Sequence, residues 1–200
     1  CIAGVDSLGM PVYNENYSFP TLLHEFNHSF VNYLLDANRD KFEKSGKTIF
    51  ASVKEIMAQQ AYGDWAIVLN EALVRASVIK YMKDHNLDSS MVNEEVKTQL
   101  KRGFYWIRQL VEELEIYDSQ RDKYPTLESY VPNLIQFYKK IADEETERDK
   151  KRPKVLSITE FKNGNEKVSS GITTITINFD RPLLGEGYSI YTGNKGDEAF

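Results

Sequence analysis

The first 150 residues carry apolar side chains at intervals of three and four positions, the spacing of a helix with a buried face. This pattern predicts five helices, over residues 19–35, 47–62, 64–85, 91–117 and 126–147. We expect interruptions at Ser45-Gly46, at Gly63-Asp64, between Asn86 and Ser90, and at Pro125. Because a proline inside a helix removes a hydrogen-bond donor, Pro132 predicts a kink or a restart near Tyr130.

From Pro153 onward the period changes to that of a strand. Ile175, Ile177 and Phe179 alternate with polar residues, which predicts a strand with one solvent-exposed face. Further strand candidates are residues 154–161 and 188–192. At the join, the charged stretch 143–152 is interpreted as a helix end that runs into a solvated linker, with an interaction tail as the alternative.

The two periodicities predict a mainly α domain over residues 1–150 and an all-β segment over residues 153–200. The segments Pro153 to Gly164 and Thr173 to Pro182 resemble the opening strands of a bacterial immunoglobulin-like module, which implies a spacer or adhesive stalk. Such a sandwich needs about seven strands and about 100 residues. We therefore expect the all-β domain to be incomplete at its C-terminus and the natural chain to continue beyond Phe200. Separately, we expect the α domain to be incomplete at its N-terminus.

Composition narrows the classes of function. With 41% apolar residues, 12 Tyr and 10 Phe, the chain can bury a core, so global disorder is excluded. A net charge of -5 argues against nucleic acid as a main partner, and no apolar run approaches the roughly 18–20 residues of a transmembrane helix. The single cysteine, Cys1, excludes a cysteine-based zinc site. Cys1 is either an acylated terminus or, as we favour, a fragment boundary.

Residues 24–28 read His-Glu-Phe-Asn-His, an H-E-x-x-H motif. On a helix, His24 and His28 share one face and can reach one metal ion, with Glu25 beside it. Ser18 can cap this helix and Pro20 suits its first turn. The apolar residues expected to form its buried side are Leu22, Leu23, Phe26, Phe30, Val31 and Leu34. A helix with two surface histidines is the alternative interpretation.

A catalytic zinc ion needs three protein ligands, and Glu71 is the candidate for the third. It lies in a strongly apolar helix beside Ile67, Val68 and Val74, where an unpaired carboxylate would cost several kcal/mol. Arg75, four residues on, is the alternative partner for this charge. His85 lies about 21 Å further along the same helix, so it cannot share an ion with Glu71. Other acidic candidates, Glu55 and Glu94-Glu95, lie among polar residues and need no special explanation.

Together, the motif and the downstream Asn70-Glu71 pair resemble a gluzincin-type zinc metallopeptidase over roughly residues 1–140. The run T-L-L-H-E-F-N-H-S-F-V-N is more closely similar to an uncharacterised family of secreted bacterial zincin-like proteins, known as a domain of unknown function. These resemblances imply a zincin-like fold, Zn²⁺ held by His24, His28 and Glu71, and an extracytoplasmic location. The spacing between His28 and Glu71 is longer than in many gluzincins.

The residues before the motif predict a hairpin. Residues 2–5 and 11–13 flank Asp6-Ser7-Leu8-Gly9, a plausible turn. In zincins an edge strand lies along the cleft and binds extended peptide as an added strand, so the resemblance implies that role here. Alternatively, the hairpin is the end of a larger sheet.

These observations predict zinc-dependent hydrolysis of peptide bonds, with Glu25 as the general base and a protein or peptide as substrate. The oxyanion-stabilising residue is left open among Tyr105, Tyr117, Arg121 and Tyr124. Two alternatives are a catalytically inactive zincin-like binding or adhesion protein on an immunoglobulin-like stalk, and a zinc hydrolase for a substrate other than peptide. Cleavage specificity and oligomeric state are not readable from the sequence.

Overall fold

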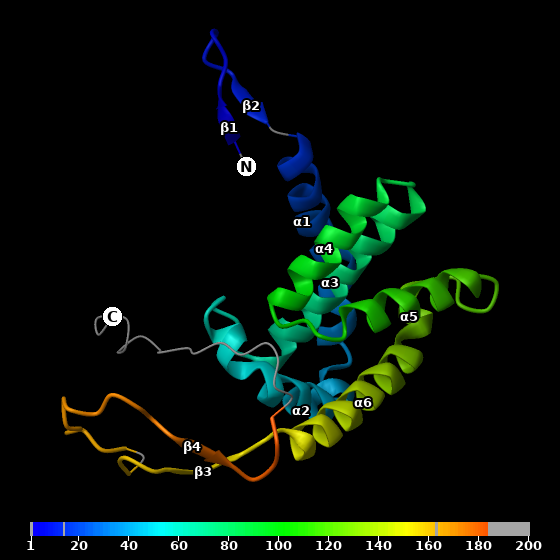
Figure 1. Cartoon of the computed structure of the whole chain (residues 1–200). Coiled ribbons are helices and arrows are strands. Elements are labelled where there is room, and N and C mark those ends of the chain that lie inside the picture. Colours follow the sequence, from blue (N-terminus) through cyan, green and yellow to red (C-terminus); the bar gives the residue numbers. More distant parts are fainter. Residues whose placement is uncertain (1, 14, 163, 184–200) are drawn as a thin grey trace. The chain divides into compact units, whose positions relative to one another are not determined.

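The computed structural model describes residues 2–13, 15–162 and 164–183 (Figure 1). These residues form six α-helices and four short strands. In chain order the elements are β1 (Ile2–Val5), β2 (Pro11–Tyr13), α1 (Glu15–Asp36), α2 (Arg39–Ala58), α3 (Trp65–Asp84), α4 (Ser89–Lys101), α5 (Ile107–Ser119), α6 (Leu127–Lys151), β3 (Val155–Ile158) and β4 (Ile177–Phe179). The chain divides into two compact units, residues 1–149 and 150–200. No described helix is long and apolar enough to cross a membrane.

Helix α3 is the centre of the first unit, because α1, α2, α4 and α5 all pack against it. It is apolar around most of its circumference, as a helix enclosed by other helices must be. Its start is capped by Asp64, whose carboxylate accepts a hydrogen bond from the Ala66 N–H at 2.8 Å. The helix predicted over residues 64–85 is therefore confirmed to within one residue at each end.

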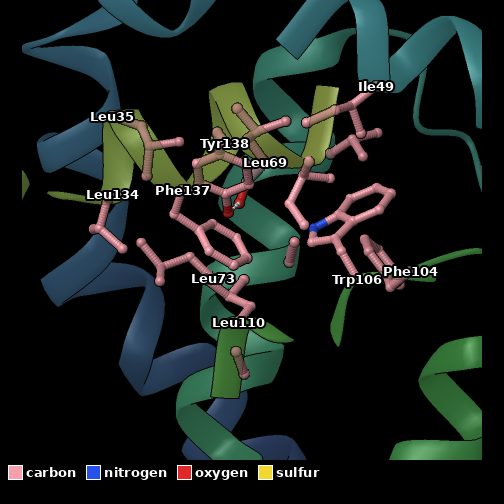
Figure 2. Close-up of a cluster of buried hydrophobic side chains, with 14 of the residues drawn as sticks. Leu35, Ile49, Leu69, Leu73, Phe104, Trp106, Leu110, Leu134, Phe137 and Tyr138 are labelled. Carbon is pink, nitrogen blue, oxygen red and sulfur yellow. Dashed lines mark hydrogen bonds between the residues drawn. The ribbon is translucent and has the colours of Figure 1, made fainter. Parts of the chain in front are cut away.

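The aromatic core lies around this helix. Figure 2 shows Leu69 and Leu73 of α3 among the buried side chains of Trp106, Leu110 and Tyr138. The fully buried Tyr138 of α6 packs its ring against Phe42 of α2, with 5.8 Å between the ring centroids. Its hydroxyl donates to the Leu69 carbonyl at 3.4 Å, which satisfies a polar group that burial would otherwise penalise.

The restart predicted near Tyr130 is wrong. Helix α6 begins at Leu127 and runs without interruption through Pro132. Its start is set by Thr126, whose hydroxyl oxygen accepts a hydrogen bond from the Ser129 N–H at 3.3 Å. Because Pro132 lies in the second turn, the missing N–H removes a single hydrogen bond near the helix start, and burial of the following apolar residues keeps the helix intact.

The predicted start of the second helix is also wrong. Helix α2 begins at Arg39, so Ser45-Gly46 lies inside it rather than before it. Gly46 is buried against α3, and a Cβ atom at this position would lie 2.2 Å from Cε3 of Trp65. The glycine is therefore a close-packing position between α2 and α3, and its absent side chain makes room for the indole.

The single helix predicted over residues 91–117 is two helices, α4 and α5. The chain turns at Gly103, whose φ of +95° is a left-handed conformation that glycine adopts without strain. The turn places Phe104 and Trp106, both fully buried, in the core. The sequence carries a helical period across this turn because the buried aromatic residues continue the three- and four-residue spacing.

Helix α1 begins at Glu15, so Ser18 and Pro20 lie inside it rather than at its start. Its predicted buried side is correct for Val31 and Leu34, which are 1% and 2% exposed. The prediction is wrong for Leu22, Phe26 and Phe30, which are 66%, 63% and 54% exposed. Among the residues whose burial is described, α1 buries its last turns against the core, and the apolar face around the motif remains uncovered.

Two antiparallel hairpins complete the described structure. Strands β1 and β2 pair as predicted, and the Asp6 carboxylate closes their turn by accepting from the N–H groups of Leu8 and Met10, each at 2.8 Å. In the second unit, β3 pairs with β4, but both are shorter than predicted. This two-stranded ribbon does not establish the expected immunoglobulin-like sandwich, and the strand predicted over residues 188–192 lies outside the described residues.

Candidate functional site

The two motif histidines and Glu71 meet at one point. His24 and His28 lie one turn apart on α1, and their Nε2 atoms are 3.1 Å apart. Glu71 approaches them from α3, with Oε2 3.5 Å from His24 Nε2 and Oε1 3.4 Å from His28 Nε2. The structure therefore brings together side chains that are separated by more than forty residues of sequence, because α1 packs directly against α3.

The hydrogen bond of His28 directs a lone pair of its ring to this point. His28 Nδ1 lies 3.0 Å from the side-chain oxygen of Asn32, which can only accept, so Nδ1 carries the proton and Nε2 is left free to bind. Burial lowers the pKa of His24, and the nearby Arg75 guanidinium lowers it further, against the opposing effect of the Glu71 carboxylate. The neutral form that a metal requires is thus favoured at His24.

Glu71 also has partners of its own. Arg75 Nη2 donates to Glu71 Oε2 at 2.7 Å, and the Tyr62 hydroxyl donates to the same oxygen at 3.0 Å. Arg75 in turn donates to the Tyr62 hydroxyl at 2.9 Å and to Gln99 Oε1 of α4 at 3.2 Å. Burial raises the pKa of the Tyr62 phenol, so it stays a donor. Arg75 is thus a partner of the Glu71 charge, and Oε1 remains turned toward His28.

His24, His28 and Glu71 line a cleft of about 820 Å³. Helix α1 supplies Pro20, Thr21, His24, Glu25 and His28 to its lining, and α3 supplies Glu71, Arg75 and Val78. The remaining lining residues are Tyr62, Glu95, Thr98, Gln99 and Arg102. Glu25 is exposed and lies beside the histidines in the cleft lining, so it is available to a molecule that enters the cleft.

The geometry fits a divalent metal ion. In a tetrahedral zinc site with bonds of about 2.0–2.1 Å, neighbouring ligand atoms are about 3.3 Å apart. The two Nε2 atoms are 3.1 Å apart, Glu71 Oε2 is 3.5 Å from His24 Nε2, and Glu71 Oε1 is 3.4 Å from His28 Nε2. With one ligand atom taken from each residue, all three atoms lie within 4.8 Å of one another. Two imidazoles and one carboxylate are also the donor set of catalytic zinc sites, and these side chains are a group that could hold a metal ion.

The four candidates for oxyanion stabilisation lie elsewhere. Within the described part of the chain, Tyr105, Tyr117, Arg121 and Tyr124 do not line the cleft. Arg148 stacks on Tyr105, while Tyr117 and Tyr124 pack against Tyr130, and Arg121 donates to the Pro125 carbonyl. These contacts assign the four side chains to packing at other places in the first unit.

Of the alternative metal ligands considered from the sequence, only one lies in the cleft. His85 ends α3, where it stacks on Tyr81 with 3.8 Å between ring centroids, and it does not line the cleft. Glu55 and Glu94 are exposed outside the cleft lining, whereas Glu95 lines the cleft, contrary to expectation.

Sequence reasoning missed several residues of the site. Asn32 has a recognisable signal, since it lies one helical turn after His28. Tyr62 and Gln99 have no such signal, because their roles depend on how the connection after α2 and the face of α4 lie beside α3.

Comparison with known proteins gives one family. No curated protein and no solved structure matches the chain. Residues 4–137 match the model of a domain of unknown function (DUF4932), a span that contains the whole cleft. Since this match covers more than half of the chain, the protein belongs to the DUF4932 family.

Proposed function

We propose that this chain is a zinc-dependent peptidase, in which His24, His28 and Glu71 hold the metal ion and Glu25 acts as the general base. The observation that carries the proposal is the convergence of two Nε2 atoms and a carboxylate, 3.1 to 3.5 Å apart, in the wall of an open cleft. The H-E-x-x-H order supports it further, because Glu25 precedes the second histidine on the same helix and lines the same cleft.

Each residue of the site has its own role in this proposal. A zinc ion, when bound, would act as a Lewis acid that lowers the pKa of water toward about 7 and polarises a carbonyl group. Glu25 accepts the proton of the attacking water and passes it to the leaving amine. Asn32 orients the His28 ring, while Arg75 and Tyr62 orient the largely buried Glu71 carboxylate by hydrogen bonds.

The resemblances to a secreted bacterial family and to an immunoglobulin-like module extend this proposal to the location of the protein. We propose that it lies outside the cytoplasm of a bacterium and that the second unit belongs to an immunoglobulin-like stalk. A non-catalytic binding protein is the second candidate, and one observation favours it: Glu71 Oε2 already accepts hydrogen bonds from Arg75 and Tyr62.

The deciding experiment compares wild type with Glu25→Gln. We expect about one zinc ion per chain in both proteins, and cleavage of a mixed peptide library by wild type alone, blocked by a chelator. Equal cleavage by Glu25→Gln would refute the role of Glu25. Stoichiometric zinc without cleavage by either protein would favour the binding protein, and absence of bound zinc would refute the metal site itself.

A further inference from the structure

Helix α4 contributes a polar stripe to the cleft. Glu95, Thr98 and Gln99 line the cleft together with Arg102, the residue directly after the end of α4, whose backbone is still close to helical. The last three follow Glu95 by three, four and seven positions, so all four share one face. Gln99 fixes this face relative to the metal-ligand candidates, since it accepts a hydrogen bond from Arg75, the partner of Glu71. The cleft wall beyond the catalytic residues is thus polar.

Arg102 is the cation of this stripe, and its guanidinium is available to bind a ligand. Arg75, the other arginine in the cleft lining, donates hydrogen bonds to Glu71, Tyr62 and Gln99. The Arg102 guanidinium is exposed and has no hydrogen bond or ion pair with any residue that the structure describes. It lies one helical turn, about 4.5 Å along the axis, beyond Gln99. An unpaired guanidinium in the wall of a cleft is matched to a carboxylate, which it can bind through two parallel hydrogen bonds.

The backbone around Arg102 is held in place. Its N–H donates to the Thr98 carbonyl at 3.1 Å, and its own carbonyl accepts from Gln60 Nε2 at 2.7 Å. The next residue, Gly103, makes the turn into α5. Anchoring of this kind reduces the entropy lost when the side chain binds a ligand, because only the side chain remains to be ordered.

We propose that Arg102 selects substrates that carry a carboxylate near the bond to be cleaved, an inference that rests on the proposed peptidase function. Besides Glu71, the cleft lining carries the carboxylates of Glu25 and of Glu95, whose Oε1 accepts a hydrogen bond from Gln99 Nε2 at 2.5 Å. Both negative charges repel a substrate carboxylate from the rest of the cleft, so Arg102 determines where that carboxylate lies. The carboxylate has two possible sources, an acidic side chain and the free C-terminus of a peptide. The first makes the enzyme selective for acidic sequences, and the second makes it selective for chain ends.

The test measures binding rather than turnover. Zinc-loaded Glu25→Gln protein is titrated into fluorescently labelled peptides, and anisotropy reports affinity. One arm compares a neutral peptide with a free C-terminus against its C-terminal amide. The other arm uses amidated peptides and compares Glu with Gln at each position in turn. We expect one arm to show about tenfold tighter binding of the peptide that carries the carboxylate. That arm shows whether Arg102 binds an acidic side chain or a free C-terminus.

Variants then assign the preference to Arg102. In the same background, Arg102→Met should reduce the ratio of affinities to about one, and Arg102→Lys should keep part of it, because a single ammonium lacks the paired donors. Arg108→Met is the matched control, since Arg108 is an exposed arginine of α5 outside the cleft lining, and it should keep the full ratio. Zinc content and melting temperature show that each variant is folded.

The outcomes separate this proposal from the peptidase function. Equal affinity for carboxylate and neutral peptides, a preference that survives Arg102→Met, or no binding of any peptide would each overturn the role of Arg102. Cleavage of peptides by wild type without a carboxylate preference would leave the peptidase intact and remove only this inference. A preference that depends on Arg102, without cleavage, would support a carboxylate-binding cleft and refute the peptidase.

Discussion

Glu71 is shared between an arginine of its own helix and two histidines of another. Arg75 Nη2 lies 2.7 Å from Glu71 Oε2, while His24 and His28 lie within 3.5 Å of the same carboxylate. The side chains of Glu71 and Arg75 are only 12% and 8% exposed, so neither charge is well solvated. Arg75 therefore supplies a cation to the Glu71 carboxylate and orients it, and the carboxylate still faces the histidines.

The first prediction concerns the ligand set. Glu71→Ala and His24→Ala should each reduce bound zinc from about one per chain to well below that, because two remaining ligands do not make a stable site. His85→Ala is the control, since His85 caps the end of α3 outside the cleft. Metal analysis after exhaustive dialysis gives the answer, and full retention of zinc by Glu71→Ala would remove Glu71 from the site.

A second prediction follows from the hydrogen bond between Asn32 and His28. Asn32→Leu should weaken zinc binding roughly 10- to 100-fold, since partners that orient a ligand ring typically have effects of this size. Competition with a zinc chelator of known affinity measures the change. Asn93→Leu, at an exposed position of α4 outside the cleft, serves as control, and equal affinities in the two variants would contradict the role of Asn32.

The third prediction tests the Glu71–Arg75 pair. In the presence of chelator, Arg75→Met should lower the free energy of unfolding by about 3–5 kcal/mol, because it leaves a largely buried carboxylate without its cation. Urea denaturation measures this loss. Adding Glu71→Gln should recover part of it, since the uncompensated charge is then removed.

A control for this pair comes from the surface. Lys47→Met breaks the exposed contact with Glu43 and should change stability by less than about 1 kcal/mol. A double variant no more stable than Arg75→Met alone would show that the arginine stabilises the fold by packing, for example on the Phe104 ring.

A fourth prediction concerns the contact between α2 and α3. Gly46→Ala should destabilise the protein by roughly 1–3 kcal/mol, because the new methyl group would overlap the Trp65 indole. Gly63→Ala is the matched control, since no atom lies within 4 Å of the added Cβ atom. Thermal unfolding of both variants measures the difference, and a neutral Gly46→Ala would mean that the two helices do not approach so closely.

The fifth prediction compares the two faces of α1. Leu34→Ala should cost about 2–5 kcal/mol, as expected for a leucine lost from a packed core. Leu22→Ala should stay within about 0.5 kcal/mol of wild type, because Leu22 is mostly exposed. Urea denaturation measures both. A large loss for Leu22→Ala would show that this face is covered in the natural protein.

Much of the local structure could be read from the sequence. The helix containing Glu71 was predicted to within one residue, because its apolar positions and the cap at Asp64 agree. The predicted helix boundaries were wrong at glycines, because a glycine can either end a helix or allow two helices to pack closely. Gly46 looked like a helix break and is a packing position, whereas Gly103 ends a helix that the apolar period carried straight through. Local patterns cannot separate these cases, because the difference lies in which helix packs opposite the glycine.

By itself, the sequence determined that His24, Glu25 and His28 share one helix and that Glu71 is a carboxylate in an apolar segment, since both follow from spacing along a single helix. Three features depend on how the helices pack: Glu71 turns toward the histidines, Tyr62 and Arg75 hold it there, and the face of α4 that ends at Arg102 forms the cleft wall. Helical periodicity sets which residues share a face, but the packing of different helices sets which faces meet.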